Sequence, residues 1–115
     1  MTMNEEYAQA ERGRAEVDAL QGLTLLEFGA PWCGHCRAAQ PLLAKVLADR
    51  EDIHHLKIED GPGRPLGRSF RVKLWPTLIL LRQGEELARL VRPTNTTDIQ
   101  QALDHVSGSQ SADMA

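Results

Sequence analysis

The sequence predicts an α/β domain in which helices cover both faces of a central mixed β-sheet. Helical and strand patterns alternate along most of the chain, in the order helix, strand, helix, strand, helix, strand, strand, helix. The last two strands follow one another across the polar segment Arg82-Gln83-Gly84-Glu85, which predicts an antiparallel hairpin. Strands that alternate with helices, together with one hairpin, are typical of a mixed sheet with helices on both sides.

The first half of the chain supplies two helices and one strand. A helix is expected over about residues 5–20, capped by Asn4, although Gly13 in its middle disfavours a continuous helix. Its apolar positions include Tyr7, Ala8, Ala15, Ala19 and Leu20. Leu23 to Gly29 is a short, mostly apolar run that predicts a buried strand. A second helix is expected from Cys33 to about Asp49, with a kink at Pro41.

The second half supplies three strands and two helices. Strands are expected over 53–58, 77–81 and 86–91, and a short, irregular helix over the Pro- and Gly-rich residues 62–70. Thr97 and Gln100 have the spacing of a capping box and open the last helix. The apolar side of that helix consists of Ile99, Leu103 and Val106. Residues 107–115 are small and polar, so we expect one domain over 1–106 and a disordered tail.

Composition narrows the function classes. The chain has 115 residues, 42% of them hydrophobic, and a net charge of -3, which gives no reason to expect nucleic acid or an anionic membrane as a partner. The N-terminus lacks the basic and apolar regions of a secretory signal, and no apolar run reaches the length of a membrane span. We therefore expect a cytoplasmic, monomeric protein.

The two cysteines, Cys33 and Cys36, are separated by two residues. The cytoplasm keeps thiols reduced, so a structural disulfide is not expected there. This spacing instead indicates a catalytic pair or a metal-binding pair.

The residues around this pair resemble those of the thioredoxin superfamily. The run Leu-Leu-Glu-Phe-Gly-Ala-Pro-Trp-Cys-Gly-His-Cys is followed about forty residues later by Trp-Pro-Thr, and the likeness spans about residues 22–106. The Cys-Gly-His-Cys core and the preceding Glu-Phe-x-Ala-Pro-Trp most resemble the catalytic domains of protein disulfide isomerase. The resemblance implies a thioredoxin-like fold, with thioredoxin's first strand missing or rudimentary, and thiol–disulfide oxidoreductase activity without a metal or organic cofactor.

The resemblance also assigns roles to residues. Cys33, at a helix start where the dipole favours a thiolate, would attack a substrate disulfide, and the more buried Cys36 would resolve the mixed disulfide. Glu27, a charged residue inside an apolar strand, would accept the proton of Cys36 through water. Lys57 matches a lysine that approaches this carboxylate, and His35 would stabilise the Cys33 thiolate. The residues expected to contact substrate are Trp32, Gly34, Trp75, Pro76, Thr77 and Arg92.

Two positions around the site depart from thioredoxin. His35 stands where thioredoxin has proline, which predicts a reduction potential nearer that of protein disulfide isomerase, about −180 mV, than that of thioredoxin, about −270 mV. Arg92 stands where thioredoxin has a glycine. With Arg37, Arg71 and Lys73 it would form a positive collar that steers acidic partners. If the bond before Pro76 is cis, Trp75 would present its backbone to a substrate strand.

Three alternatives stay open at this stage. The motif favours an oxidase or isomerase, whereas the expected cytoplasmic location favours a reductase acting on protein disulfides and recycled by a thioredoxin reductase or glutathione. Zinc binding would need further ligands such as His35, His54 or His55, but the two adjacent histidines of a strand face opposite ways. A third alternative is a chaperone-like adaptor, which would have the thioredoxin-like fold, bind a partner protein and catalyse disulfide exchange only slowly.

Overall fold

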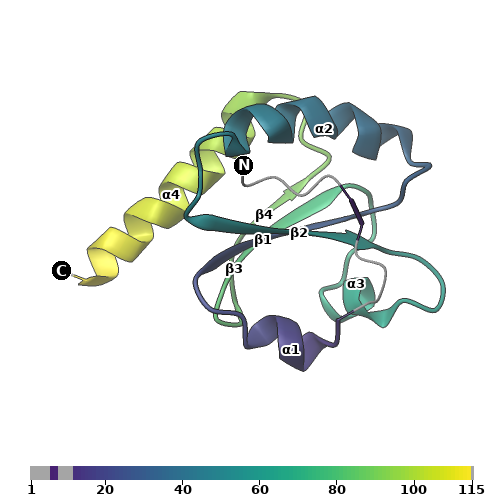
Figure 1. Cartoon of the computed structure of the whole chain (residues 1–115), viewed down its shortest axis with the longest axis horizontal. Coiled ribbons are helices and arrows are strands. Elements are labelled where there is room, and N and C mark those ends of the chain that lie inside the picture. The colour runs from purple at the N-terminus through teal and green to yellow at the C-terminus, as the bar shows by residue number, and fades with distance from the viewer. Residues whose placement is uncertain (1–5, 8–11, 115) are drawn as a thin grey trace.

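The computed structural model describes residues 6–7 and 12–114, with side chains as far as Ser107. Its elements are α1 (Arg14–Asp18), β1 (Leu23–Gly29), α2 (Gly34–Leu47), β2 (Ile53–Glu59), α3 (Pro65–Ser69), β3 (Thr77–Arg82), β4 (Glu85–Val91) and α4 (Thr96–Met114) (Figure 1). The order matches the one predicted from the sequence. The short hairpin turn forms because Gln83 and Gly84 both adopt positive φ angles, 48° and 87°.

The four strands form one mixed sheet in the order β2-β1-β3-β4. β1 pairs in parallel with β2 and antiparallel with β3, and β4 continues the sheet antiparallel to β3. β1 is therefore a central strand, and all seven of its residues are buried. A side chain on β1 lies in the interior whichever face it points to, which explains why this strand has an almost continuous apolar sequence.

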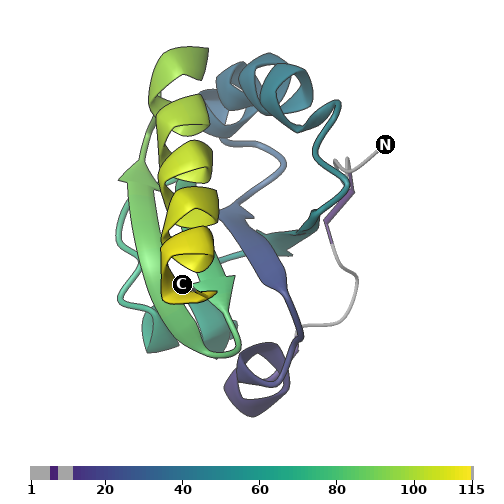
Figure 2. The same ribbon diagram turned by 90° about the vertical axis from the view of Figure 1, so that its left-hand side faces the viewer.

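The sheet separates two apolar clusters. On one face, Leu23 and Leu25 of β1 pack with α2 and α4, which lie side by side (Figures 1 and 2). On the other face, Leu26 and Phe28 pack with residues from α1, α3 and the segment that follows α3. The prediction of a mixed sheet with helices on both faces is confirmed. Among the described residues, no strand precedes β1.

The first helix is much shorter than the sequence predicts. α1 covers only Arg14–Asp18, and Gly13 precedes it in an extended conformation with φ −75° and ψ 158°. Glycine disfavours the interior of a helix, so the helix begins after Gly13 instead of running through it. Tyr7 is not helical, and the predicted cap Asn4 lies outside the described residues.

The last helix differs from its prediction at both ends. The Asn95 side chain, and not Thr97, caps it: Asn95 Oδ1 accepts a 2.8 Å hydrogen bond from the backbone N–H of Asp98. The predicted Thr97–Gln100 capping box is therefore wrong by two residues, because the side chain that precedes the first turn accepts the unpaired N–H. The helix also continues to Met114, where a disordered tail was expected, since no proline after residue 93 interrupts it. A domain boundary at residue 106 stays a prediction.

Candidate active site

Cys33 and Cys36 lie where β1 ends and α2 begins. Cys33 is the N-cap of α2, and its Sγ accepts a 3.2 Å hydrogen bond from the backbone N–H of Cys36. This arrangement directs unpaired N–H groups of the first helical turn at the Cys33 sulfur, where they stabilise a thiolate. Both cysteines are free thiols, with 8% of Cys33 and 1% of Cys36 exposed. His35 and Gly34 are exposed in the same turn.

Cys36 packs directly over the last residue of β1. A Cβ added to Gly29 would lie 2.5 Å from Cys36 Sγ and 3.2 Å from the Tyr7 hydroxyl. Glycine is therefore required at this strand end so that the buried sulfur has space. Burial raises the pKa of Cys36 to about 12, and its hydrogen bond with Cys33 acts in the same direction. Cys36 is thus a protonated thiol at neutral pH.

Glu27 is completely buried on β1, behind the cysteines. Its two carboxylate oxygens have different partners: His55 Nε2 lies 2.9 Å from Oε1, and Gln40 Nε2 donates to Oε2 at 2.7 Å. The same Gln40 nitrogen donates to the backbone carbonyl of Cys36 at 2.9 Å, which ties the carboxylate to the first turns of α2. A buried carboxylate is tolerated only when it is hydrogen-bonded in this way.

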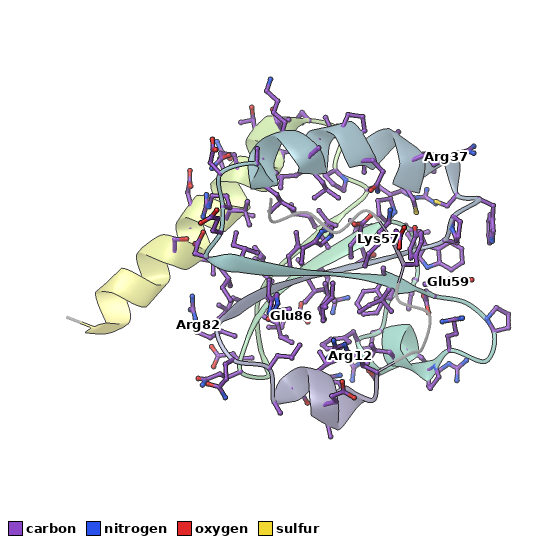
Figure 3. The ribbon with its side chains drawn as sticks, viewed as in Figure 1. Arg12, Arg37, Lys57, Glu59, Arg82 and Glu86 are labelled. Atoms are coloured by element: carbon purple, nitrogen blue, oxygen red, sulfur yellow. The ribbon has the colours of Figure 1, made fainter. Side chains whose placement is uncertain are left out.

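Lys57 reaches Glu27 through Gln40. Its Nζ donates to Gln40 Oε1 at 3.0 Å, and Gln40 in turn donates to Glu27. Lys57 is largely buried on β2, and Figure 3 shows its side chain between α2 and the sheet. The lysine is therefore linked to the buried carboxylate by a bridging amide, while His55 contacts the carboxylate directly.

A cavity of about 340 Å³ opens beside Cys36. It is lined by Glu6, Tyr7, Ala30, Pro31, Cys36, Arg37, Gln40 and Lys57. Arg37 is the exposed residue after Cys36, at the start of α2 (Figure 3). The cavity gives solvent a route to the buried thiol on the side lined by Tyr7 and Lys57.

Two tryptophans form the outer surface of the site. Trp32 is 71% exposed, and its ring meets that of Trp75 edge-on at a centroid distance of 5.4 Å. Trp75 packs against the small cluster formed by Ala30, Cys33 and Cys36, and it donates from Nε1 to Asp60 Oδ2 at 2.9 Å. The indole of Trp75 is therefore anchored to the loop after β2 and also borders the reactive pair.

The segment around Trp75 meets β4 through Arg92. The Trp75–Pro76 peptide bond is cis. Arg92 has a positive φ of 51°, donates from its backbone N–H to the Pro76 carbonyl, and donates from Nε to the Trp75 carbonyl, both at 2.9 Å. Thr77 is buried, and its hydroxyl donates inward to the Leu74 carbonyl at 2.6 Å. Of the predicted substrate contacts, Trp32, Gly34 and Arg92 are thus exposed, whereas Thr77 shapes the loop.

Sequence reasoning missed three residues of this site. His55 shares a strand face with Lys57, and the alternation of β2 contained the signal for its position next to Glu27. Gln40 follows Cys36 by four residues, so both lie on the same side of α2. No pattern in the sequence indicated Tyr7, because it belongs to a non-helical segment whose path depends on tertiary packing.

The described part of the chain shows neither a metal-binding cluster nor a membrane-spanning helix. It contains no cluster of three or more histidine, cysteine, aspartate or glutamate side chains arranged to hold a metal ion. None of its helices has the length and apolar character needed to cross a bilayer.

Known proteins with similar sequences include thioredoxins and a protein disulfide-isomerase. The thioredoxin family profile matches residues 6–105. A thioredoxin from Chlamydia pneumoniae is 37% identical over 70 residues, which are 61% of this chain and 69% of that protein. A rice thioredoxin H2-1 is 33% identical over 69 residues, and the match spans only half of its length. A protein disulfide-isomerase A2 from Pongo abelii is 45% identical over 64 residues, 52% of this chain and 12% of that protein.

Solved structures agree with this family. The reduced thioredoxin 2 of Pseudomonas aeruginosa is 53% identical, with a TM-score of 0.83 over 93% of this chain and 99% of the other. A thioredoxin from Nicotiana alata is 27% identical, with a TM-score of 0.65 over 76% of each chain. The profile covers nearly all of the domain, and the paired cysteines occupy the strand-to-helix junction. This chain belongs to the thioredoxin family.

Proposed function

We propose that this protein is a protein thiol–disulfide oxidoreductase that exchanges disulfides through Cys33 and Cys36. One observation carries the proposal: Cys33, 8% exposed, lies at the N-terminus of α2, and the protonated thiol of Cys36, 1% exposed, lies one turn further along the helix. This asymmetry suits a nucleophile followed by a resolving thiol. Family membership supports the same activity.

The reaction has two balanced steps. The Cys33 thiolate attacks one sulfur of a substrate disulfide, forms a mixed disulfide and releases the other substrate sulfur as a thiolate. Cys36 then loses its proton and attacks Cys33 Sγ, which forms the Cys33–Cys36 disulfide and expels the second substrate thiolate. The substrate gains two electrons and the protein loses two.

Glu27 is the proposed proton acceptor of the second step. Burial is the main cause of the raised pKa of Cys36, and the negative charge of the Glu27 carboxylate acts in the same direction. Gln40 links the Glu27 carboxylate to the backbone carbonyl of Cys36. These two hydrogen bonds fix the position of the base relative to the residue that carries the thiol. His55 and Lys57 are positioning residues, because they act on the reaction only through Glu27 and Gln40.

Substrate is proposed to bind across the exposed surface formed by the two tryptophans, Gly34 and Arg92. Pro76 and Thr77 hold the Trp75 loop against β4. An extended peptide would pair with the backbone of Trp75 as a short added strand. Such pairing recognises main-chain groups, so the side chains of Trp32, Trp75 and Arg92 would determine which sequences are preferred.

The direction of net disulfide exchange depends on the redox potential of the compartment in which the protein acts. We propose a cytoplasmic reductase that acts on protein or peptide disulfides and is recycled by a thioredoxin reductase or by glutathione. The oxidised Cys33–Cys36 disulfide would accept two electrons from that donor, which restores the dithiol.

The test is the reduction potential of the Cys33–Cys36 pair in glutathione buffers, measured beside insulin reduction. We expect a value nearer about −180 mV than about −270 mV, and His35→Pro should lower it, because the protein loses a donor that stabilises the thiolate. The control is His105→Gln, which changes an exposed histidine of α4 that is far from Cys33 in the sequence. The reduction potential of this variant should equal that of the unaltered protein. Absence of exchange with insulin and with small disulfides would refute the proposed function. An unchanged potential in His35→Pro would refute only the role of His35.

A further inference from the structure

Tyr7 lies beside Cys36, the more buried cysteine of the reactive pair, although fifteen residues separate it from the start of β1. A Cβ added to Gly29 would lie 3.2 Å from the Tyr7 hydroxyl and 2.5 Å from Cys36 Sγ, so the hydroxyl and the thiol lie close together above this glycine. Lys57 Nζ lies 4.6 Å from the centroid of the Tyr7 ring, a favourable cation–π contact that fixes the ring. Tyr7 also lines the cavity beside Cys36. No other tyrosine is present in the chain.

The surroundings of Cys36 otherwise disfavour its ionisation. Burial and the neighbouring Cys33 both oppose a thiolate there, and the Glu27 carboxylate on β1 adds a negative charge. The Ala30 backbone contributes a hydrogen bond that favours the thiolate. Lys57 on β2 and Arg37 on α2 line the same cavity, with Glu6 at its edge. A second hydrogen-bond donor on Cys36 Sγ would therefore have a direct effect on how easily this thiol reacts.

We propose that Tyr7 is a catalytic residue of the resolving step, in which its hydroxyl donates a hydrogen bond to Cys36 Sγ and stabilises the attacking thiolate. The inference rests on the proposed function and extends it, since it assigns a group to the second exchange step alone. The Tyr7 hydroxyl lies beside Cys36 above Gly29, whereas Cys33 Sγ accepts its hydrogen bond from a backbone N–H at the N-terminus of α2.

The step balances without a change in the protonation of Tyr7. The Cys36 proton passes to Glu27 and from there to solvent, the Cys36 sulfur bonds to Cys33 Sγ, and the substrate sulfur departs with the electron pair of the broken bond. Burial, assisted by the charges that Cys36 and Glu27 carry when ionised, raises the pKa of Tyr7 well above its usual value. The phenol therefore keeps its proton and acts as a donor throughout.

The test separates the two steps with a symmetrical aromatic disulfide, dithiobis-nitrobenzoate, added to the reduced full-length protein. Attack by Cys33 releases one coloured thiolate at a rate that depends on reagent concentration. Attack by Cys36 on the mixed disulfide releases a second at a rate that does not. Tyr7→Phe keeps the ring over Lys57 and removes only the hydroxyl. We expect it to leave the first phase unchanged and to slow the second about tenfold, the usual effect of one hydrogen bond to a charged group.

Thr24→Val is the matched control. It also deletes one buried hydroxyl, on β1, and Thr24 Oγ1 has no hydrogen-bond partner among the described residues. We expect both phases to match those of the unaltered protein. A second phase that is unchanged in Tyr7→Phe, or two phases slowed equally, would overturn the role of Tyr7. If the unaltered protein releases no second thiolate, the proposed function itself fails, so the two failures are distinguishable.

A second measurement is independent of how well Tyr7→Phe folds. Incorporation of 3-fluorotyrosine labels residue 7 alone, because the chain has one tyrosine. Its fluorine NMR signal should shift between the dithiol and disulfide forms of the full-length protein, since Cys36 Sγ exchanges its hydrogen bond for a bond to Cys33. A signal that is the same in both forms would also overturn the proposal.

Discussion

Both oxygens of the Glu27 carboxylate accept hydrogen bonds although the side chain has no exposed surface. His55 contacts one oxygen and Gln40 the other, and Lys57 acts from a distance through the Gln40 amide. A buried charge needs such partners, because an unpaired one would cost several kcal/mol (about 2–7 even for a neutral polar group). Sequence reasoning identified Glu27 from its charge inside an apolar strand, but it named only Lys57 as a partner.

The role of Glu27 leads to a prediction about pH. Glu27→Gln should slow the resolving step about a hundredfold at neutral pH, the lower range of general base catalysis. Burial raises the pKa of Cys36 to about 12, so without a base its thiolate fraction increases with pH over the whole range below that value. The rate in Glu27→Gln should therefore increase about tenfold per pH unit, and the deficit should shrink at alkaline pH.

Stopped-flow release of the second aromatic thiolate, measured over pH, gives this rate. Glu51→Gln is the control, since Glu51 is an exposed carboxylate in the turn before β2. A Glu27→Gln rate equal to that of the unaltered protein near neutral pH would exclude Glu27 as the base.

At the scale of elements, the loop before β3 and the end of β4 are joined by one side chain. Arg92 Nε donates to the Trp75 carbonyl, so the arginine occupies a main-chain acceptor that an added substrate strand would use. The sequence indicated that Arg92 lies near the substrate. It did not indicate this contact, because the approach of β4 to the Trp75 loop depends on the hairpin and on the left-handed backbone of Arg92.

Arg92→Gly should therefore make the Trp75 carbonyl accessible. We expect kcat/KM for insulin reduction to increase about fivefold, the effect of one hydrogen bond that a substrate no longer has to displace. Glycine also suits the positive φ at this position. Gln83→Gly is the control, because Gln83 in the hairpin turn also has a positive φ, 48°. It should leave kcat/KM unchanged. A decrease of kcat/KM in Arg92→Gly would show that the contacts of the arginine with substrate outweigh its obstruction of the Trp75 carbonyl.

The start of α4 offers a test of helix capping. Asn95→Ala removes the acceptor for the Asp98 N–H and should lower the free energy of unfolding by about 1 kcal/mol. Thr97→Ala, at the residue that the sequence pattern suggested as the cap, should change it by less than about 0.5 kcal/mol. Urea denaturation of both variants measures the difference. A larger loss for Thr97→Ala than for Asn95→Ala would contradict the assigned cap.

For the molecule as a whole, the apolar clusters on the two faces of the sheet define the domain. Among the described side chains of α4, the last buried one is Val106, and it packs with Ile99 and Leu103 on the α2 face. Beyond it, Ser107 accepts a 3.1 Å hydrogen bond from Arg50, whose guanidinium also pairs with Asp104. The sequence predicts that the domain ends at residue 106, which is this last described core residue.

A chain shortened to residues 1–106 should retain the fold and the exchange activity. It loses the partly buried Arg50–Ser107 hydrogen bond, so the free energy of unfolding should fall by about 1 kcal/mol. Thermal and urea unfolding, together with insulin reduction, measure this. A loss of several kcal/mol would mean that residues 107–115 belong to the folded domain.

The sequence by itself determined the order of elements, the central buried strand and the identity of the reactive pair. These are local properties: the period of apolar residues distinguishes helices from strands, and Cys33-Gly34-His35-Cys36 is contiguous. Only the tertiary structure decided that His55 and Gln40 contact Glu27, that Arg92 occupies the Trp75 carbonyl, and that Tyr7 reaches Cys36. Each of these contacts joins segments far apart in the chain, or depends on how α2 packs over the sheet, and no local pattern encodes such distances.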